Sequence, residues 1–432
     1  MANRGRLKAL GPGLLMAGAA IGVSHLVQAT RAGAIYGFGL ILLVVVANVA
    51  KYPAFRFGPA YATATGTSLL EGYRRQGRWA LWIYLLVTLG TMFTVQAAVA
   101  VVCAGLAKVM FGIEASAPSV AVGIIVVCAA LLAVGRYRWL DAINKVIIVA
   151  LTVATLAATA LTLPHIEFGA MPWWPESTTT ADIFFFAALV GWMPSAIDIS
   201  VWNSLWTLAR RETSGHTPSR DESLFDFHLG YWGTAFLALC FLVLGAGVMY
   251  GTGAQIQTSA GGFAAQIIDL YTQALGEWAR PLIGGCAFLV MFSTTFTVVD
   301  GFPRALATLG LRFRREEVPW GSAEKPRTDA DGIGGFKLAY WGSLAILAIG
   351  ASIVLFTLMT SLKAMVDLAT TLSFLTAPVL ATLNHRAMFD ESVPADHRPT
   401  PLLRLASLGG ITFLGGFAAY YVWLRFLGPM LG

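Results

Sequence analysis

The fold is decided by a stretch near the N-terminus that reads GAAIGVSHLVQATRAGA, residues 18–34. It lies inside an apolar segment, yet Gly22, Ser24 and His25 interrupt what a simple membrane anchor would fill with Leu, Val and Ala. A second interrupted segment, ALVGWMPSAIDISVW, covers residues 188–202. Backbone groups freed inside a bilayer are tolerated only where protein or a water-filled cavity surrounds them, so two such breaks indicate a solute site between them. The sequence therefore predicts a membrane transporter.

Composition supports this class. The chain has 432 residues, of which 57% are hydrophobic and 12% charged, against about 25% charged residues in a soluble domain. With about 20 residues per crossing, we predict an all-α multi-pass membrane protein with about eleven transmembrane helices. The predicted spans are 12–34, 37–58, 79–106, 118–135, 140–163, 181–208, 229–252, 281–303, 336–359, 362–383 and 402–428.

The distribution of basic residues predicts the orientation in a cell inner (plasma) membrane. Lys and Arg gather in alternate short loops, at Arg4, Arg6, Lys8, Arg74, Arg75, Arg78, Arg136, Arg138, Arg210, Arg211, Arg220, Arg312, Arg314, Arg315, Lys325, Arg327, Arg386 and Arg398. By the positive-inside rule these loops are cytoplasmic, so the N-terminus lies inside and, with an odd number of spans, the C-terminus outside. The net charge of +6 thus reflects topology, and no nucleic acid partner is predicted; the partners are the lipid bilayer and a small-molecule or ion substrate.

The whole chain, residues 1–432, is predicted to form one transmembrane transporter domain. Because each interrupted segment opens a set of five spans, residues 1–163 and 181–383 are expected to form two inverted repeats, with 402–428 as an extra helix 11. The four cysteines, Cys103, Cys128, Cys240 and Cys286, all sit in apolar spans, which is typical of buried small hydrophobes. No cofactor is predicted.

The first break supplies three candidate substrate-binding residues. Gly22 lowers helix propensity, and the Ser24 hydroxyl can cap the second half-helix. An unwound segment here would present backbone N–H groups at a positive dipole end, which attracts an anionic or polar group; the alternative is a glycine-rich packing face. An ionisable His25 at membrane depth usually faces a cavity, as substrate ligand or proton acceptor, unless it is a hydrogen-bonded structural residue.

The second break supplies four further candidate substrate-binding residues. Pro194 removes a backbone donor and should leave carbonyls near Gly191 without partners. Met193 offers a thioether to a metal or an apolar wall to an organic solute, and Ser195 follows Pro194 in the same break. A buried Asp198 needs a partner, a bound cation or a proton, which makes it a candidate for coupling; the alternative is a structural ion pair with Arg or Lys.

Three further polar positions lie inside apolar spans. Gln96 could line the same cavity and take part in coupling. Asp300 precedes Arg304 by four residues, so a local ion pair is expected there. Asp367 follows Lys363 at the same spacing, which permits either a pair or a place at the substrate site.

At these residues the chain resembles the NRAMP family of proton-coupled metal transporters. The runs LGPGLLMAGAAI and RAGAIYGFGLILLVVVAN, and the Met193–Pro194 pair, resemble runs of that family. The resemblance implies a LeuT-like fold, alternating access between two membrane faces, and a midplane substrate site between unwound helices 1 and 6.

The metal-site motifs of that family are altered. Its DPGN is replaced by the run from Gly22 to His25, and its MPH by Met193, Pro194 and Ser195. Gln96 and Val99 stand near its two acidic helix-three residues. Asp367 stands near a Gln that contributes to its site.

Three functions remain open on this sequence. The favoured one is secondary active transport of another small solute, such as an organic acid or amino acid, with protons as a possible coupling ion. The second is transport of Mn²⁺, Fe²⁺ or Mg²⁺ through remodelled ligands, namely His25, Met193, Asp198 and Asp367. The third is a nontransporting membrane sensor. An enzyme is not predicted, because adjacent helix residues such as Ser24 and His25 point about 100° apart and cannot form a nucleophile–base pair.

Overall fold

The computed structural model describes residues 11–134, 137–175, 178–214, 217–253, 257–317, 319, 334–358 and 361–427. Side chains are not described at 137–148, 212–214 and 334. Several of the basic residues used to predict the orientation therefore lie outside the described residues or carry no described side chain: Arg4, Arg6, Lys8, Arg136, Arg138, Lys325 and Arg327.

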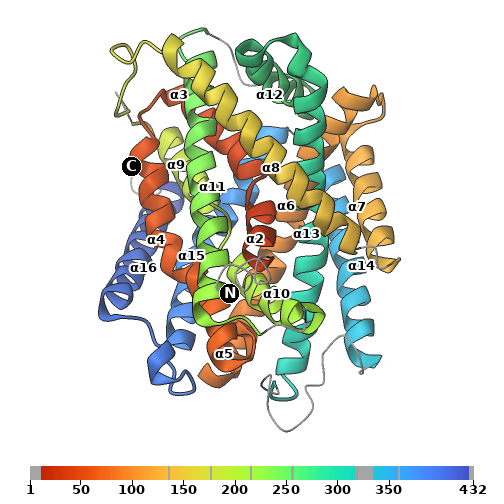
Figure 1. Ribbon diagram of the computed structural model, residues 1–432, viewed down its shortest axis with the longest axis vertical. Coiled ribbons are helices and arrows are strands. Elements are labelled where there is room, and N and C mark those ends of the chain that lie inside the picture. The colour runs from red at the N-terminus through yellow and green to blue at the C-terminus, as the bar shows by residue number, and fades with distance from the viewer. Residues whose placement is uncertain are drawn as a thin grey trace, which may run out of the picture.

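The all-α prediction is confirmed, since the described residues form helices and no strand. The long helices are α2 (Pro12–Ala20), α3 (Thr30–Tyr36), α4 (Ile41–Thr65), α5 (Leu69–Gln76), α6 (Arg78–Phe111), α7 (Ala117–Ala133), α8 (Tyr137–Thr162), α9 (Thr180–Gly191), α10 (Ile199–Ser214), α11 (Arg220–Met249), α12 (Ala260–Leu275), α13 (Arg280–Arg312), α14 (Gly334–Thr357), α15 (Leu362–Met388) and α16 (Pro401–Val422). Figure 1 shows most of them in a bundle along the long axis, with α5 and α12 at opposite ends.

Seven helices of the described residues are long and apolar enough to cross a membrane, and a bent pair makes an eighth span. That pair joins α2 to residues 24–36 with a bend of 45°. The remaining predicted spans correspond to α7, α8 and the α9–α10 pair. α7, α9 and the part of α8 with described side chains are shorter apolar helices. The structure therefore contains the breaks predicted in spans one and six.

Burial separates inner helices from outer ones. In the most apolar window of each, the helix that carries α13 is 72% buried and α6 is 67% buried, whereas α14 is 28% and α16 22% buried. Apolar side chains that face outward, such as Leu338, Leu402 and Leu405, suit contact with lipid. The inner helices α6 and α13 pack on each other, and α13 also contacts α2, so the first break lies against the best-buried part of the bundle.

Candidate functional site

The first break begins where α2 ends at Ala20. A single turn of wide π-helix, η1 (Ser24–Ala29), then leads into α3. The Ser24 hydroxyl donates a 2.6 Å hydrogen bond back to the carbonyl of Ala20 and so bridges the break. The expectation that Ser24 caps the second half-helix is wrong, because no side chain caps η1 and Ser24 serves the preceding half-helix instead.

Gly22 allows α13 to approach the break. A Cβ at Gly22 would lie 3.0 Å from Oγ1 of Thr294, tighter than ordinary van der Waals contact. The Thr294 hydroxyl lies 2.9 Å from the carbonyl oxygen of Gly18 and 3.3 Å from that of Ile21. The same hydroxyl lies 3.0 Å from the carbonyl oxygen of Val290 in its own helix, so its single hydrogen is available to one of three carbonyls at a time, two of them at the first break.

The second break spans the residues between the end of α9 at Gly191 and the start of α10 at Ile199, and its Met193–Pro194 peptide is cis. Gly191 packs directly on α15, because a Cβ there would lie 2.0 Å from the carbonyl oxygen of Thr370. No larger residue fits without moving one of the two helices.

The carbonyls of this break do have a partner, and it is a lysine. The Nζ of Lys51, on α4, donates to the carbonyl of Gly191 at 2.7 Å and to that of Ser195 at 3.0 Å. The prediction that carbonyls near Gly191 lack partners is therefore wrong. Lys51 is fully buried, and sequence reasoning missed it. The sequence did contain an indication, because Lys51, like His25, is an ionisable residue in the middle of an apolar span.

A narrow cavity of about 30 Å³ lies between the two breaks. A bound water needs roughly 10–15 Å³ on this scale, so the closed cavity has room for about two waters or one small ion. Its polar lining comes from Ser24, Ser195, Asp198 and Thr294, and its apolar lining includes Val95, Val99 and Val298 together with Trp192 and Trp202. Of the predicted substrate-binding residues, the structure thus brings Ser24, Ser195 and Asp198 to one cavity.

Among the residues that the structure describes, Asp198 is the only carboxylate that lines this cavity. It sits just before α10, is 5% exposed, and its Oδ1 has no hydrogen-bond partner in the described structure. Lys51 lies close enough to attract it electrostatically, although no direct ion pair forms between them. The indole N–H of Trp202, which also lines the cavity, forms no hydrogen bond of standard geometry in the described part of the chain. These two groups give a ligand or water hydrogen-bonding positions in the cavity.

His25 lies next to the cavity and points away from it. Its Nε2 donates to the carbonyl of Thr234 on α11 at 2.9 Å, and its Nδ1 lies 2.7 Å from the hydroxyl of Ser24. The expectation that Ser24 and His25 point apart is therefore wrong, because the wide turn of η1 lets these neighbours contact each other. Its ring also meets Phe241 edge to face, with centroids 6.2 Å apart. Ser24, which lines the cavity, connects this buried ring to it.

The other predicted residues lie elsewhere. Asp367 pairs with Arg31 at 2.6 Å and does not line the cavity, so neither the local pair with Lys363 nor the place at the substrate site that the sequence permitted is found. Met193 and Gln96 are completely buried and line no part of the cavity, and both polar atoms of Gln96 lack a partner in the described structure. The expected Asp300–Arg304 pair is present at 2.8 Å.

Consequently the four residues of the metal hypothesis, His25, Met193, Asp198 and Asp367, do not converge on one point. Only Asp198 reaches the cavity. Among the described residues, no group of three or more His, Cys, Asp and Glu side chains is arranged to hold a metal ion.

Two groups of polar contacts join helices of the bundle outside the cavity lining. On the α3 side, Arg31 binds Asp367 and stacks its guanidinium 4.8 Å above the ring of Phe185, while Gln28 bridges to Thr370. These contacts join η1 and α3 to α9 and α15.

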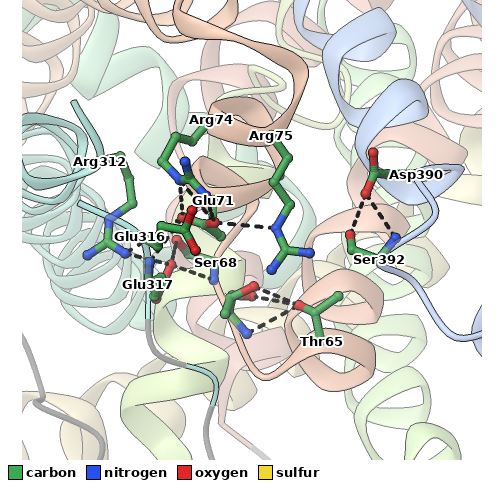
Figure 2. A network of polar contacts seen from close by, with 12 residues as sticks. Thr65, Ser68, Glu71, Arg74, Arg75, Arg312, Glu316, Glu317, Asp390 and Ser392 are labelled. Atoms are coloured by element: carbon green, nitrogen blue, oxygen red, sulfur yellow. Dashed lines mark hydrogen bonds and ion pairs between the residues drawn. The ribbon is translucent and has the colours of Figure 1, made fainter. Parts of the chain in front are cut away.

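On the α5 side, the buried Glu71 carboxylate forms the centre of a network that Figure 2 shows. Arg74 donates to it at 2.8 Å and Arg75 at 3.3 Å. The backbone N–H of Glu317, beyond the end of α13, donates to it at 3.1 Å. Ser68 in turn donates its hydroxyl to the Glu317 carboxylate at 2.6 Å. The network therefore ties the segment before α5 to the end of α13.

Comparison with known proteins identifies the same fold. The sequence profile of the natural resistance-associated macrophage protein-like (Nramp) family matches residues 13–424. An uncharacterized protein of Pasteurella multocida (strain Pm70) is 35% identical over 428 residues, covering 96% of this chain and 92% of that protein.

Solved structures agree. A crystal structure of a variant of the Eremococcus coleocola manganese transporter superposes with a TM-score of 0.70 at 13% identity, covering 95% of this chain and 85% of the other. A crystal structure of MhsT in complex with L-phenylalanine gives a TM-score of 0.63 at 12% identity, covering 96% of this chain and 98% of the other. At such identities the likeness concerns the fold alone, and it confirms the predicted LeuT-like architecture.

Proposed function

The chain belongs to the NRAMP family and is therefore a membrane transporter, and from that premise we propose that it carries a small amine-bearing organic solute, such as an amino acid, by secondary active transport. The proposal depends on the carboxylate of Asp198, whose Oδ1 has no hydrogen-bond partner in the described structure. It lines a cavity whose other walls are hydroxyls, aliphatic side chains and two tryptophans. That carboxylate can accept hydrogen bonds from a protonated amine.

The charge balance of the site argues against a divalent cation as its cargo. A transition-metal ion is normally held by several carboxylate, imidazole or thiolate ligands that offset its charge. Here one carboxylate lines the cavity, and the ammonium of Lys51 already lies near it. A divalent cation would add two positive charges to a site whose net charge is close to zero. A zwitterionic solute adds no net charge and needs no further counter-ion.

The walls of the cavity suit a small organic molecule. Hydroxyls from Ser24, Ser195 and Thr294 can orient polar groups of the solute, and Trp192 and Trp202 can cover its apolar part. Because the cavity measures only about 30 Å³ in this closed conformation, the solute must enter while the site is open to one side. The solved structure of MhsT, which contains L-phenylalanine, supports the view that this fold can accommodate an amino acid.

Divalent metal transport is the second candidate, and the small closed volume favours it. A dehydrated metal ion would fit about 30 Å³ without expansion, and similarly folded structures come from a manganese transporter. In this alternative Asp198 would be joined by hydroxyls and backbone oxygens rather than by the dispersed His25, Met193 and Asp367.

We propose protons as the coupling ion, with His25 as the proton-binding residue. A hydroxyl carries a single hydrogen. When the ring is neutral and Nε2–H donates to Thr234, both Nδ1 and the carbonyl of Ala20 compete for the hydrogen of Ser24. A second proton on the ring completes all three contacts, because Nδ1–H then donates to Ser24 and Ser24 donates to Ala20. Proton binding at His25 would thereby fix the hydroxyl that faces the solute.

The substrate proposal is tested with purified protein in proteoliposomes. Uptake of radiolabelled amino acids is compared with uptake of Mn²⁺ under an inward proton gradient, beside a metal-transporting NRAMP protein as control. We expect saturable uptake of at least one amine-bearing solute and none of Mn²⁺. Sustained uptake also excludes a nontransporting sensor.

The decisive variant is Asp198→Asn, which keeps the shape of the side chain and removes its charge. We expect it to reduce solute uptake at least about tenfold, the effect of losing roughly 1.4 kcal/mol of charge-assisted binding. Asp269→Asn is the matched control, because Asp269 pairs with Arg280 on α12 and α13, outside the cavity. Mn²⁺ uptake that disappears in Asp198→Asn would replace our proposal with metal transport.

A further inference from the structure

Backbone carbonyls at the second break point inward at membrane depth, where each needs a donor or a cation. In the discontinuous helices of transporters, such carbonyls commonly coordinate the coupling cation. In this chain two of them, from Gly191 and Ser195, converge on one positively charged atom, the Nζ of Lys51, at 2.7 and 3.0 Å.

Lys51 is an unusual residue for the middle of an apolar transmembrane helix. It lies in the middle of α4, with 0% of its surface exposed, where an unpaired ammonium is expensive. Its cost is offset by the two carbonyls and by the nearby carboxylate of Asp198. The ammonium contacts two neutral carbonyl oxygens, and the Asp198 carboxylate attracts it from a longer distance without a direct ion pair, so a single positive charge occupies the place of a monovalent cation.

We propose that Lys51 is a tethered cation that permanently fills the cation position of the α9–α10 break, so that the solute site assembles without a dissociable inorganic cation. This inference deepens the proposed function, since it concerns the same broken helix, but it does not depend on which solute is carried. The two positive charges then have different roles. The ammonium of Lys51 stabilises the break permanently, whereas the proton on His25 binds and dissociates during transport.

The first test uses the wild-type protein in lipid nanodiscs without solute. Its thermal unfolding is followed at constant ionic strength with Na⁺, K⁺ or N-methyl-D-glucamine as the cation. We expect the same Tm in all three, because the site already contains its cation. A saturable rise in Tm with Na⁺ or K⁺ would overturn the proposal.

The second test removes the ammonium with Lys51→Ala. We expect the Tm to fall by several degrees, because two carbonyls and a carboxylate lose their positive partner. Methylammonium should raise the Tm of this variant in a saturable manner by refilling the site, as a ligand of the folded state does. Choline, which is too bulky for the site, should have no such effect.

Two variants give the matched controls. Lys363→Ala removes an exposed lysine from α15 and should leave both the Tm and its insensitivity to methylammonium unchanged. In Lys51→Ala combined with Asp198→Asn, the methylammonium effect should be lost. A normal Tm for Lys51→Ala, or equal effects of methylammonium and choline, would contradict the proposal.

If Lys51→Ala does not fold, the cation dependence of the wild-type protein still decides the question. These measurements contain no solute, so their failure would leave the substrate proposal standing. Conversely, a failure to find an amine-bearing solute would leave the tethered cation untouched.

Discussion

At the residue scale, the chemistry of the site depends on a few buried polar side chains whose partners lie far away in sequence. His25 is the clearest case, because its two ring nitrogens contact Ser24 beside it and Thr234 on α11. The sequence placed an ionisable group at membrane depth. Only the folded chain shows that it reaches the cavity through a hydroxyl rather than directly.

A glutamine at position 25 tests the proton role. His25→Gln retains hydrogen-bonding capacity but cannot bind a proton near neutral pH. We expect exchange of labelled for unlabelled solute across the membrane to persist, while accumulation driven by an inward proton gradient is lost. Both are measured in the same proteoliposomes.

The matched control is His385→Gln, since His385 contacts Ser407 on α16 and lies outside the cavity. It should leave gradient-driven accumulation intact. Normal accumulation in His25→Gln would rule out His25 as the coupling residue. His25→Ala, which removes the hydrogen bonds as well, is expected to abolish transport altogether.

At the element scale, the two broken helices are each held by a different neighbour. Thr294 of α13 contacts carbonyls of the first break, and Lys51 of α4 satisfies those of the second. Movement of either neighbour would therefore change the shape of a break and of the cavity between them. The two groups of polar contacts outside the cavity lining are predicted to control whether such movement can occur.

The Glu71 network is predicted to hold the α5 end closed. Glu71→Gln leaves the side chain in place but removes the charge that attracts the buried Arg312 of α13, 3.9 Å away on the other side of the contact between α5 and α13. Breaking a buried ion pair typically costs about 3–5 kcal/mol, and here the cost falls on the closed state. We expect the bundle to open more often at this end.

Opening is measured by labelling of Ser195→Cys, a cavity position, with a membrane-impermeant thiol reagent added from the α5 side. The rate should rise in Glu71→Gln, while the native cysteines, all buried, contribute little background. Glu277→Gln is the control, because its exposed pair with Arg280 lies at the opposite end of α13. Unchanged labelling in Glu71→Gln would show that this network does not restrict access.

At the scale of the whole molecule, the basic segments of the described chain gather at one end. Figure 1 places α5, the connection from α10 to α11 and the connection from α15 to α16 together at the lower end. The positive-inside rule predicts that this end is cytoplasmic. The inverted repeats at 1–163 and 181–383 and this orientation both stay predictions.

Orientation is tested in intact cells with two single-cysteine variants at exposed positions. Gly169→Cys lies in the connection from α8 to α9, and Glu391→Cys lies in the connection from α15 to α16. An impermeant thiol reagent should label Gly169→Cys in intact cells and Glu391→Cys only after permeabilisation. The reverse pattern would place the C-terminus in the cytoplasm.

The sequence by itself determined the membrane class, the all-α fold, the family and the places where helices one and six break. These follow from local properties, namely apolar runs of sufficient length and polar or helix-breaking residues within them, which act in the same way in any surroundings. The local pair between Asp300 and Arg304 was predictable for the same reason, since a helix fixes the spacing.

Only the tertiary structure decided which side chains contact one another between different helices. It paired Asp367 with Arg31 instead of Lys363, turned His25 toward Thr234, and brought Lys51 to the carbonyls of Gly191 and Ser195. Such contacts join residues more than a hundred positions apart, and a buried charge takes whichever oxygen the packing of the helices presents. The spacing of residues along the chain does not determine how the helices pack. The residues that line the cavity were therefore known only from the folded structure.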